Sequence, residues 1–84
     1  MPILEIALEQ KCRKEAEAHK CLLIKIEKRK GYPDRILLSP LGRMVWIEFK
    51  REGEKPAPIQ AYVHSQLREM KFKVFTIDLS LIHI

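Results

Sequence analysis

The chain of 84 residues contains no apolar run long enough to cross a membrane, which excludes a membrane-spanning function. The first five residues include the acid Glu5, whereas a secretory signal peptide begins with basic residues. Internal repeats and low-complexity segments are also absent, so a repeat architecture is excluded. We therefore expect a cytoplasmic protein without a membrane partner.

Cysteine is scarce, with thiols only at Cys12 and Cys21. In a reducing compartment both are expected to be free. Together with His19 they match no common zinc-ligand spacing, and a fourth ligand is missing. We interpret the two cysteines as buried structural thiols.

The length allows one domain with a thin core, which self-association would help to stabilise. The formal net charge of +5 favours a polyanionic partner such as nucleic acid. Many small basic proteins bind no nucleic acid, so the charge alone does not decide the function.

The pattern of apolar residues predicts an α/β (α+β) domain over residues 1–78 with the element order αβββαβ. Helices are expected over 4–18 and from Pro58 to about Lys71, because apolar residues recur there at helical spacing. Strands are expected over 21–27, 34–38, 44–50 and 72–77. The elements predict one central sheet flanked by helices.

Charged residues lie at the ends of two predicted strands. Asp34 follows Pro33 at the start of the second strand, and Glu48 and Lys50 flank Phe49 at the end of the third. Side chains alternate along a strand, so Glu48 and Lys50 share one face with Trp46, which we interpret as a core residue. If the second and third strands pair through the turn at 39–42, Asp34 lies near Glu48 or Lys50.

Two carboxylates in one place repel each other, and burial raises the pKa of at least one of them. A bound Mg²⁺ or Mn²⁺ instead favours the ionised form of both carboxylates. It also polarises a phosphate and lowers the pKa of a bound water. Lys50 could orient that water or offset transition-state charge. In the alternative interpretation Asp34 caps a turn, and Glu48 and Lys50 form an exposed ion pair.

Three segments together resemble the VRR-NUC domain, the virus-type replication-repair nuclease branch of the PD-(D/E)xK superfamily. They are Gly31-Tyr32-Pro33-Asp34-Arg35, the run 42–50 that ends in Glu48-Phe49-Lys50, and Gln60 with His64 and Leu67-Arg68. The resemblance covers nearly the whole chain, from Glu5 to about Asp78. It implies a restriction-endonuclease-like fold with a mixed sheet, and Mg²⁺- or Mn²⁺-dependent DNA cleavage in a bacterial or phage-infected cell, without a small-molecule cofactor.

The resemblance also implies roles for individual residues. Asp34 and Glu48 would be metal ligands, helped by the backbone carbonyl of Phe49, and Lys50 would be the catalytic lysine. The family's acid on the first helix would be Glu5, with Glu9 one turn later as the alternative, and Gln60 would support the site from the second helix. The catalytic residues implied in this way are Asp34, Glu48, Lys50, Glu5 and Gln60. The implied metal ligands are Asp34, Glu48, Phe49 and Glu5.

Basic residues around the predicted site are expected to contact DNA phosphates without reading the base sequence. They are Lys25, Lys28, Arg29, Lys30, Arg35 and Arg43. A solvated surface is their alternative role. His64 follows Gln60 by one helical turn and could touch a phosphate, although we interpret it as an exposed, inert histidine.

The function expected from these residues is metal-dependent cleavage of branched or otherwise structured DNA. Similarity to Holliday-junction resolvases implies a homodimer. The alternatives are a non-catalytic DNA-binding module of the same fold, and an interaction protein in which the motif arose by chance.

The last six residues, 79–84, depart from the pattern and equal the translation of the transposon mosaic end used in sequencing-library adapters. We hypothesise that they are adapter read-through without a function. Genomic sequence that continues past Asp78 through these same codons would refute this hypothesis.

Overall fold

The computed structural model describes residues 3–27, 29–51 and 53–79, with side chains from residue 6 onward. The elements follow the predicted order αβββαβ, with a short 3₁₀ turn between the second and third strands. They are α1 (Ile3–Ala18), β1 (Leu22–Lys25), β2 (Arg35–Ser39), η1 (Pro40–Gly42), β3 (Arg43–Lys50), α2 (Pro58–Glu69) and β4 (Val74–Asp78). The predicted fold class is confirmed; β1 is shorter than the predicted 21–27, and β4 begins two residues later than the predicted 72–77.

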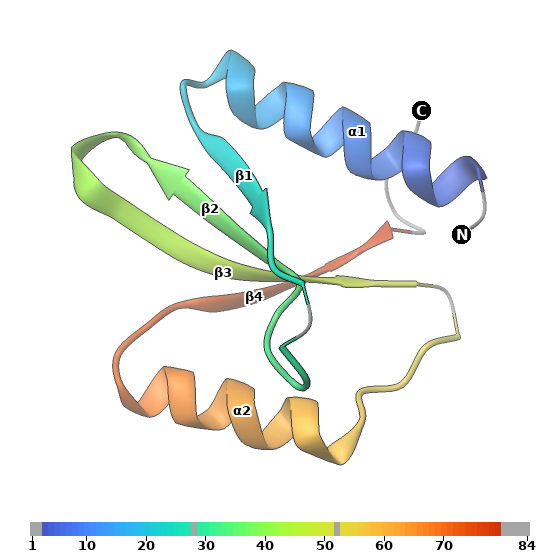
Figure 1. The fold of residues 1–84 in the computed structure, drawn as a ribbon, viewed down its shortest axis with the longest axis vertical. Helices are drawn as coiled ribbons and strands as arrows, with labels where there is room; N and C mark the ends of the chain where they lie inside the picture. Colours follow the sequence, from blue (N-terminus) through green and yellow to red (C-terminus); the bar gives the residue numbers. More distant parts are fainter. Residues whose placement is uncertain (1–2, 28, 52, 80–84) are drawn as a thin grey trace.

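The four strands form one mixed sheet in the order β1-β2-β3-β4. Strands β1, β2 and β3 pair antiparallel, whereas β4 pairs parallel with β3 because α2 carries the chain back across the sheet. Figure 1 shows α1 on one face of the sheet and α2 on the other. The domain is therefore a three-layer arrangement with β3 in the interior of the sheet.

The face of β3 toward α1 is apolar, as its alternation predicts. Ile47 and Phe49 are buried and pack with Leu8 of α1 and with Leu79. Phe49 is fully buried, so packing around its side chain holds this part of β3 in place. The residue after it, Lys50, therefore has a well-defined place at the end of the strand.

The opposite face of β3 packs on α2. Val63 and Leu67 of α2 and Val74 of β4 are buried together, with Trp46 packed against them. The Trp46 ring also lies 6.0 Å from that of Tyr32, measured between centroids. Trp46 is thus a core residue, as expected, and Glu48 follows it on the same face.

Leu79 is buried in the core near α1, although it belongs to the segment whose origin we question. Residues 80–84 lie outside the described part of the chain, so the adapter hypothesis stays a prediction. Cys12 and Cys21 are free thiols and half-buried. None of the described helices is both long and apolar enough to cross a membrane.

Candidate active site

The loop before β2 is seated directly on α2. Gly31 has φ +83°, and a Cβ at this position would lie 2.8 Å from Ile59 Cγ1 and 3.0 Å from Val63 Cγ2. Only glycine fits both the backbone conformation and the close approach. Pro33 is fully buried two residues later. The glycine and proline of the motif therefore fix where Asp34 emerges.

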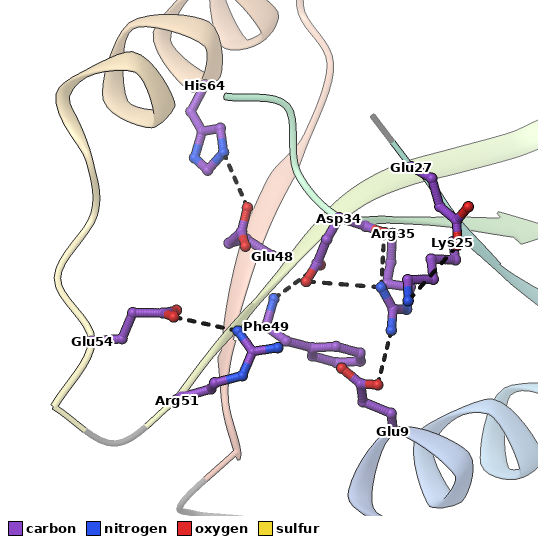
Figure 2. Close-up of polar contacts among 10 residues, drawn as sticks. All are labelled: Glu9, Lys25, Glu27, Asp34, Arg35, Glu48, Phe49, Arg51, Glu54 and His64. Atoms are coloured by element: carbon purple, nitrogen blue, oxygen red, sulfur yellow. Dashed lines mark hydrogen bonds and ion pairs between the residues drawn. The ribbon is translucent and has the colours of Figure 1, made fainter. Parts of the chain in front are cut away.

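Asp34 stands opposite Glu48. The register pairs Arg35 with Ile47, and one step further toward the strand ends lie Asp34 on one side and Glu48 on the other. Cross-strand neighbours of this kind have Cβ atoms about 4.5–5.5 Å apart. The backbone N–H of Phe49 donates a hydrogen bond of 3.2 Å to Asp34 Oδ1 (Figure 2). The register and this hydrogen bond place Asp34 beside the end of β3 that carries Glu48, and the convergence of the two carboxylates on one ion stays a prediction.

Burial shifts both acids toward their protonated forms. The pKa of Asp34 is raised chiefly by desolvation, an effect that the Phe49 N–H and the Arg35 charge oppose. The pKa of Glu48 is raised to about 7, first by desolvation and then by the negative charges of Asp34 and Glu54. The site thus carries the electrostatic strain that a bound cation would relieve.

His64 is the main correction to the sequence interpretation. It is 8% exposed rather than an exposed helical residue, and its Nε2 atom lies 3.7 Å from Glu48 Oε1 (Figure 2). Desolvation is the first cause that lowers the pKa of His64, followed by the charge of Arg68. Its spacing of one turn from Gln60 was the available signal, but its burial depends on how α2 packs on the sheet, which the spacing does not reveal.

Lys50 and Gln60 line the same cleft as Glu48 and His64, a hollow of about 280 Å³ between α2 and the ends of the strands. Lys50 Nζ lies 4.0 Å from Asp78 Oδ2, a partner that sequence reasoning missed. Gln60 Oε1 accepts a hydrogen bond of 2.9 Å from the N–H of Ala57, so Gln60 also caps α2. The structure therefore brings Lys50, Gln60 and Glu48 to one cleft.

Arg35 differs from the surface phosphate contact that was expected. It is 7% exposed, and its Nη2 atom lies 3.1 Å from Glu9 Oε2 while its Nη1 atom lies 3.8 Å from Asp34 Oδ2. Its guanidinium also lies 5.1 Å from the Phe49 ring centroid. Arg35 therefore bridges α1 to Asp34, and Glu9 joins the network from α1. The side chain of Glu5 lies outside the described residues.

The remaining basic residues are not all near the acids. Arg43 begins β3, five residues before Glu48, which corresponds to about 17 Å along a strand. Lys25 ends β1 opposite Arg35, with its Nζ atom 3.9 Å from Glu27. Arg29 lies over the Tyr32 ring, and Lys30 is exposed in the same loop. Lys28 lies outside the described residues.

The described residues offer no group of three or more His, Cys, Asp or Glu side chains close enough to bind a metal without other ligands. Mg²⁺ is commonly held by one or two carboxylates, with water and substrate phosphate completing its shell. Asp34 and Glu48 fit that mode, and Glu48 Oε1 is buried without a hydrogen-bond partner among the described residues. The Phe49 carbonyl stays a predicted third ligand.

Comparison with known proteins gives two informative similarities. The chain is 38% identical over 50 residues to the "Putative nuclease p44" of Acyrthosiphon pisum secondary endosymbiont phage 1, a match that covers 60% of this chain and 54% of that protein. The chain thus spans about half the length of this curated relative. A solved structure described as a VRR_NUC domain aligns with a TM-score of 0.75 and 28% identity, over 92% of this chain and 86% of that one. No protein-family model matches the chain.

A mixed sheet between two helices, with two acids and a lysine at the ends of its inner strands, has the fold of the solved VRR_NUC domain. The similarity to a solved VRR-NUC domain over most of the chain confirms the resemblance seen in its sequence.

The raised pKa of Glu48 predicts a pH-dependent stability in the metal-free protein. The folded-state pKa of about 7 lies above the ordinary value of 4.5, so the stability that Glu48 contributes is complete below about pH 4.5 and is lost as the pH rises through 7. Glu48→Gln stays neutral and avoids this loss. In EDTA we expect its free energy of unfolding, relative to the unsubstituted protein, to rise by on the order of 1–3 kcal/mol between about pH 4.5 and pH 8.

Urea unfolding at the two pH values measures this difference. Glu17→Gln, an exposed position on α1, is the matched control and should show no such rise. An equal pH dependence for the two variants would contradict the burial of Glu48.

Proposed function

We propose that the domain is a metal-dependent endodeoxyribonuclease that cleaves branched or otherwise structured DNA, in the manner of a Holliday-junction resolvase. The observation that carries the proposal is the pair of half-buried acids Asp34 and Glu48, both with raised pKa values, with Lys50 beside Glu48 in an open cleft. We place this activity in the cytoplasm of a bacterial or phage-infected cell.

Asp34 and Glu48 would hold Mg²⁺ or Mn²⁺ through their carboxylates. Bound there, the cation would polarise the scissile phosphate and lower the pKa of a water. The Phe49 N–H keeps Asp34 Oδ1 in place, and the Arg35 guanidinium lies near Asp34 Oδ2, so Asp34 is oriented before any ligand arrives. This orientation lowers the cost of assembling the site.

Lys50 lies on the same strand face as Glu48 and lines the cleft. Its ammonium would offset the negative charge that develops on the phosphate during attack, or orient the attacking water. The Lys50 side chain is 44% exposed and its partner Asp78 is 4.0 Å away, so the ammonium lies within reach of a phosphate in the cleft.

The basic loop before Asp34 supplies the path for the DNA backbone. Arg29 and Lys30 are exposed in this loop, which Gly31 anchors to α2 beside the acids. Arg68 adds a positive charge from within the cleft. Contacts of this kind neutralise phosphates without distinguishing bases, which favours recognition of DNA shape over sequence.

A non-catalytic DNA-binding module of the same fold is the second candidate. The basic loop is as compatible with this candidate as with the nuclease. The half-buried acids argue against it, because a carboxylate pair repels the phosphate backbone unless a cation lies between the acids and the phosphate. Cleavage assays separate the two candidates.

Asp34→Asn, Glu48→Gln and Lys50→Met should each lower the cleavage rate by at least about 10²- to 10³-fold, because each removes charge that acts on the transition state. DNA affinity in EDTA should change by less than about threefold, because the basic loop is intact. The assay uses labelled four-way junction, flap and linear duplex DNA with Mg²⁺, Mn²⁺ or EDTA, and fluorescence anisotropy for binding.

Glu17→Gln is again the control and should cleave at the normal rate. Undiminished cleavage by Glu48→Gln, or cleavage of any substrate in EDTA, would disprove the metal-dependent mechanism. Binding without cleavage under all conditions would support the non-catalytic module.

We also propose that the domain works as a homodimer through the outer edge of β4. In the strand order β4 is terminal, and Phe75 on it is 52% exposed. On the same sheet face, an open apolar hollow of about 440 Å³ lies against α1, lined in part by Cys12, Leu37 and Ile77. A second copy that covers this face would bury apolar surface that a thin core leaves exposed.

Phe75→Glu should convert the dimer to a monomer without unfolding it, because Phe75 is solvent-exposed in the single chain and the added charge opposes burial at an interface. Sedimentation equilibrium measures the mass, and Tyr62→Glu, an exposed aromatic on α2, is the control. A monomeric unsubstituted protein, or a Phe75→Glu variant that stays dimeric, would rule out this interface.

A further inference from the structure

Two buried polar atoms face each other inside the cleft. His64 Nε2 and Glu48 Oε1 lie 3.7 Å apart, and neither has a hydrogen-bond partner among the described residues. His64 is more than nine-tenths buried and extends from α2 toward the end of β3 (Figure 2). A buried polar group without a hydrogen bond destabilises the fold, so this pair requires an explanation.

Imidazole binds metal ions through the lone pair of a ring nitrogen that carries no proton. The carboxylate of Glu48 supplies an oxygen on the facing side.

The separation of the two atoms is compatible with one ion between them. Nitrogen and oxygen ligands lie about 2.0–2.2 Å from a divalent transition metal, so two ligands of one ion are about 3–4 Å apart. The measured 3.7 Å lies within this range. A direct hydrogen bond would require the two atoms to come substantially closer.

We propose that His64 Nε2 is a metal ligand that acts together with Glu48 and gives the site a preference for Mn²⁺ and Co²⁺ over Mg²⁺. The inference rests on the proposed function, because it assigns a metal to Glu48. Imidazole adds affinity for transition metals in the order Mn²⁺ < Co²⁺, whereas Mg²⁺ prefers oxygen ligands and retains its waters. The cleft leaves room for water or phosphate oxygens to complete the shell.

Calorimetric titration of Mg²⁺, Mn²⁺ and Co²⁺ into the full chain and into His64→Gln tests the proposal without measuring catalysis. We expect the variant to bind Co²⁺ and Mn²⁺ at least about tenfold more weakly, with the larger loss for Co²⁺, and to bind Mg²⁺ within about twofold of the unsubstituted protein. His19→Gln, an exposed histidine of the same chain, is the matched control and should bind all three ions normally.

A second variant, His64→Asp, replaces the nitrogen ligand with oxygen and should restore binding while moving the preference toward Mg²⁺. Circular dichroism establishes that both variants are folded, and the visible spectrum of the Co²⁺ complex should differ between the unsubstituted protein and His64→Gln. If His64→Gln does not fold, the selectivity of His64→Asp decides the question, and an unchanged ratio of Mg²⁺ to Co²⁺ affinity in that variant would overturn the inference.

Unchanged Co²⁺ and Mn²⁺ affinity in His64→Gln would overturn the inference and leave the proposed nuclease intact. An equal loss for all three ions would also overturn it, because His64 would then only position Glu48. If the unsubstituted protein bound none of the ions, the proposed function itself would fail, and so would this inference.

Discussion

Two carboxylates in a half-buried position, Asp34 and Glu48, set the requirements for the rest of this domain. Each is more costly to ionise here than in water, and the negative charge of Asp34 raises the cost for Glu48 further. Protein folds tolerate such a pair where function requires it. The surrounding groups can be understood as the means of holding the two acids together while leaving the space beside them open to a cation and a phosphate.

The support comes from three directions. The Phe49 N–H, on the interior strand β3, binds Asp34, and the ring of the same residue anchors that strand in the core. Arg35 connects Asp34 to Glu9 of α1. On the other face, Gly31 seats the motif loop on α2, and α2 also carries His64 to Glu48. Both helices therefore help to position the acids.

Much of this site could be predicted from the sequence, because the relevant information is local. Alternation along 45–50 placed Glu48 and Lys50 on one face, and the short turn at 39–42 set the strand pairing that brings Asp34 opposite Glu48. What could not be predicted depends on packing between distant elements. The burial of His64 and Arg35, and the pairing of Lys50 with Asp78, follow from how the helices and β4 dock on the sheet. The distance of Arg43 from the acids follows from its position at the other end of β3.

The most direct measurement of the central claim is the anomalous diffraction of a crystal of this protein grown with Mn²⁺. The account predicts an anomalous peak between the carboxylates of Asp34 and Glu48, within coordinating distance of at least one oxygen of each, about 2.2 Å. Side chains of Asp34 and Glu48 that point apart in the crystal, or a fully occupied Mn²⁺ bound elsewhere with none at this pair, would contradict it.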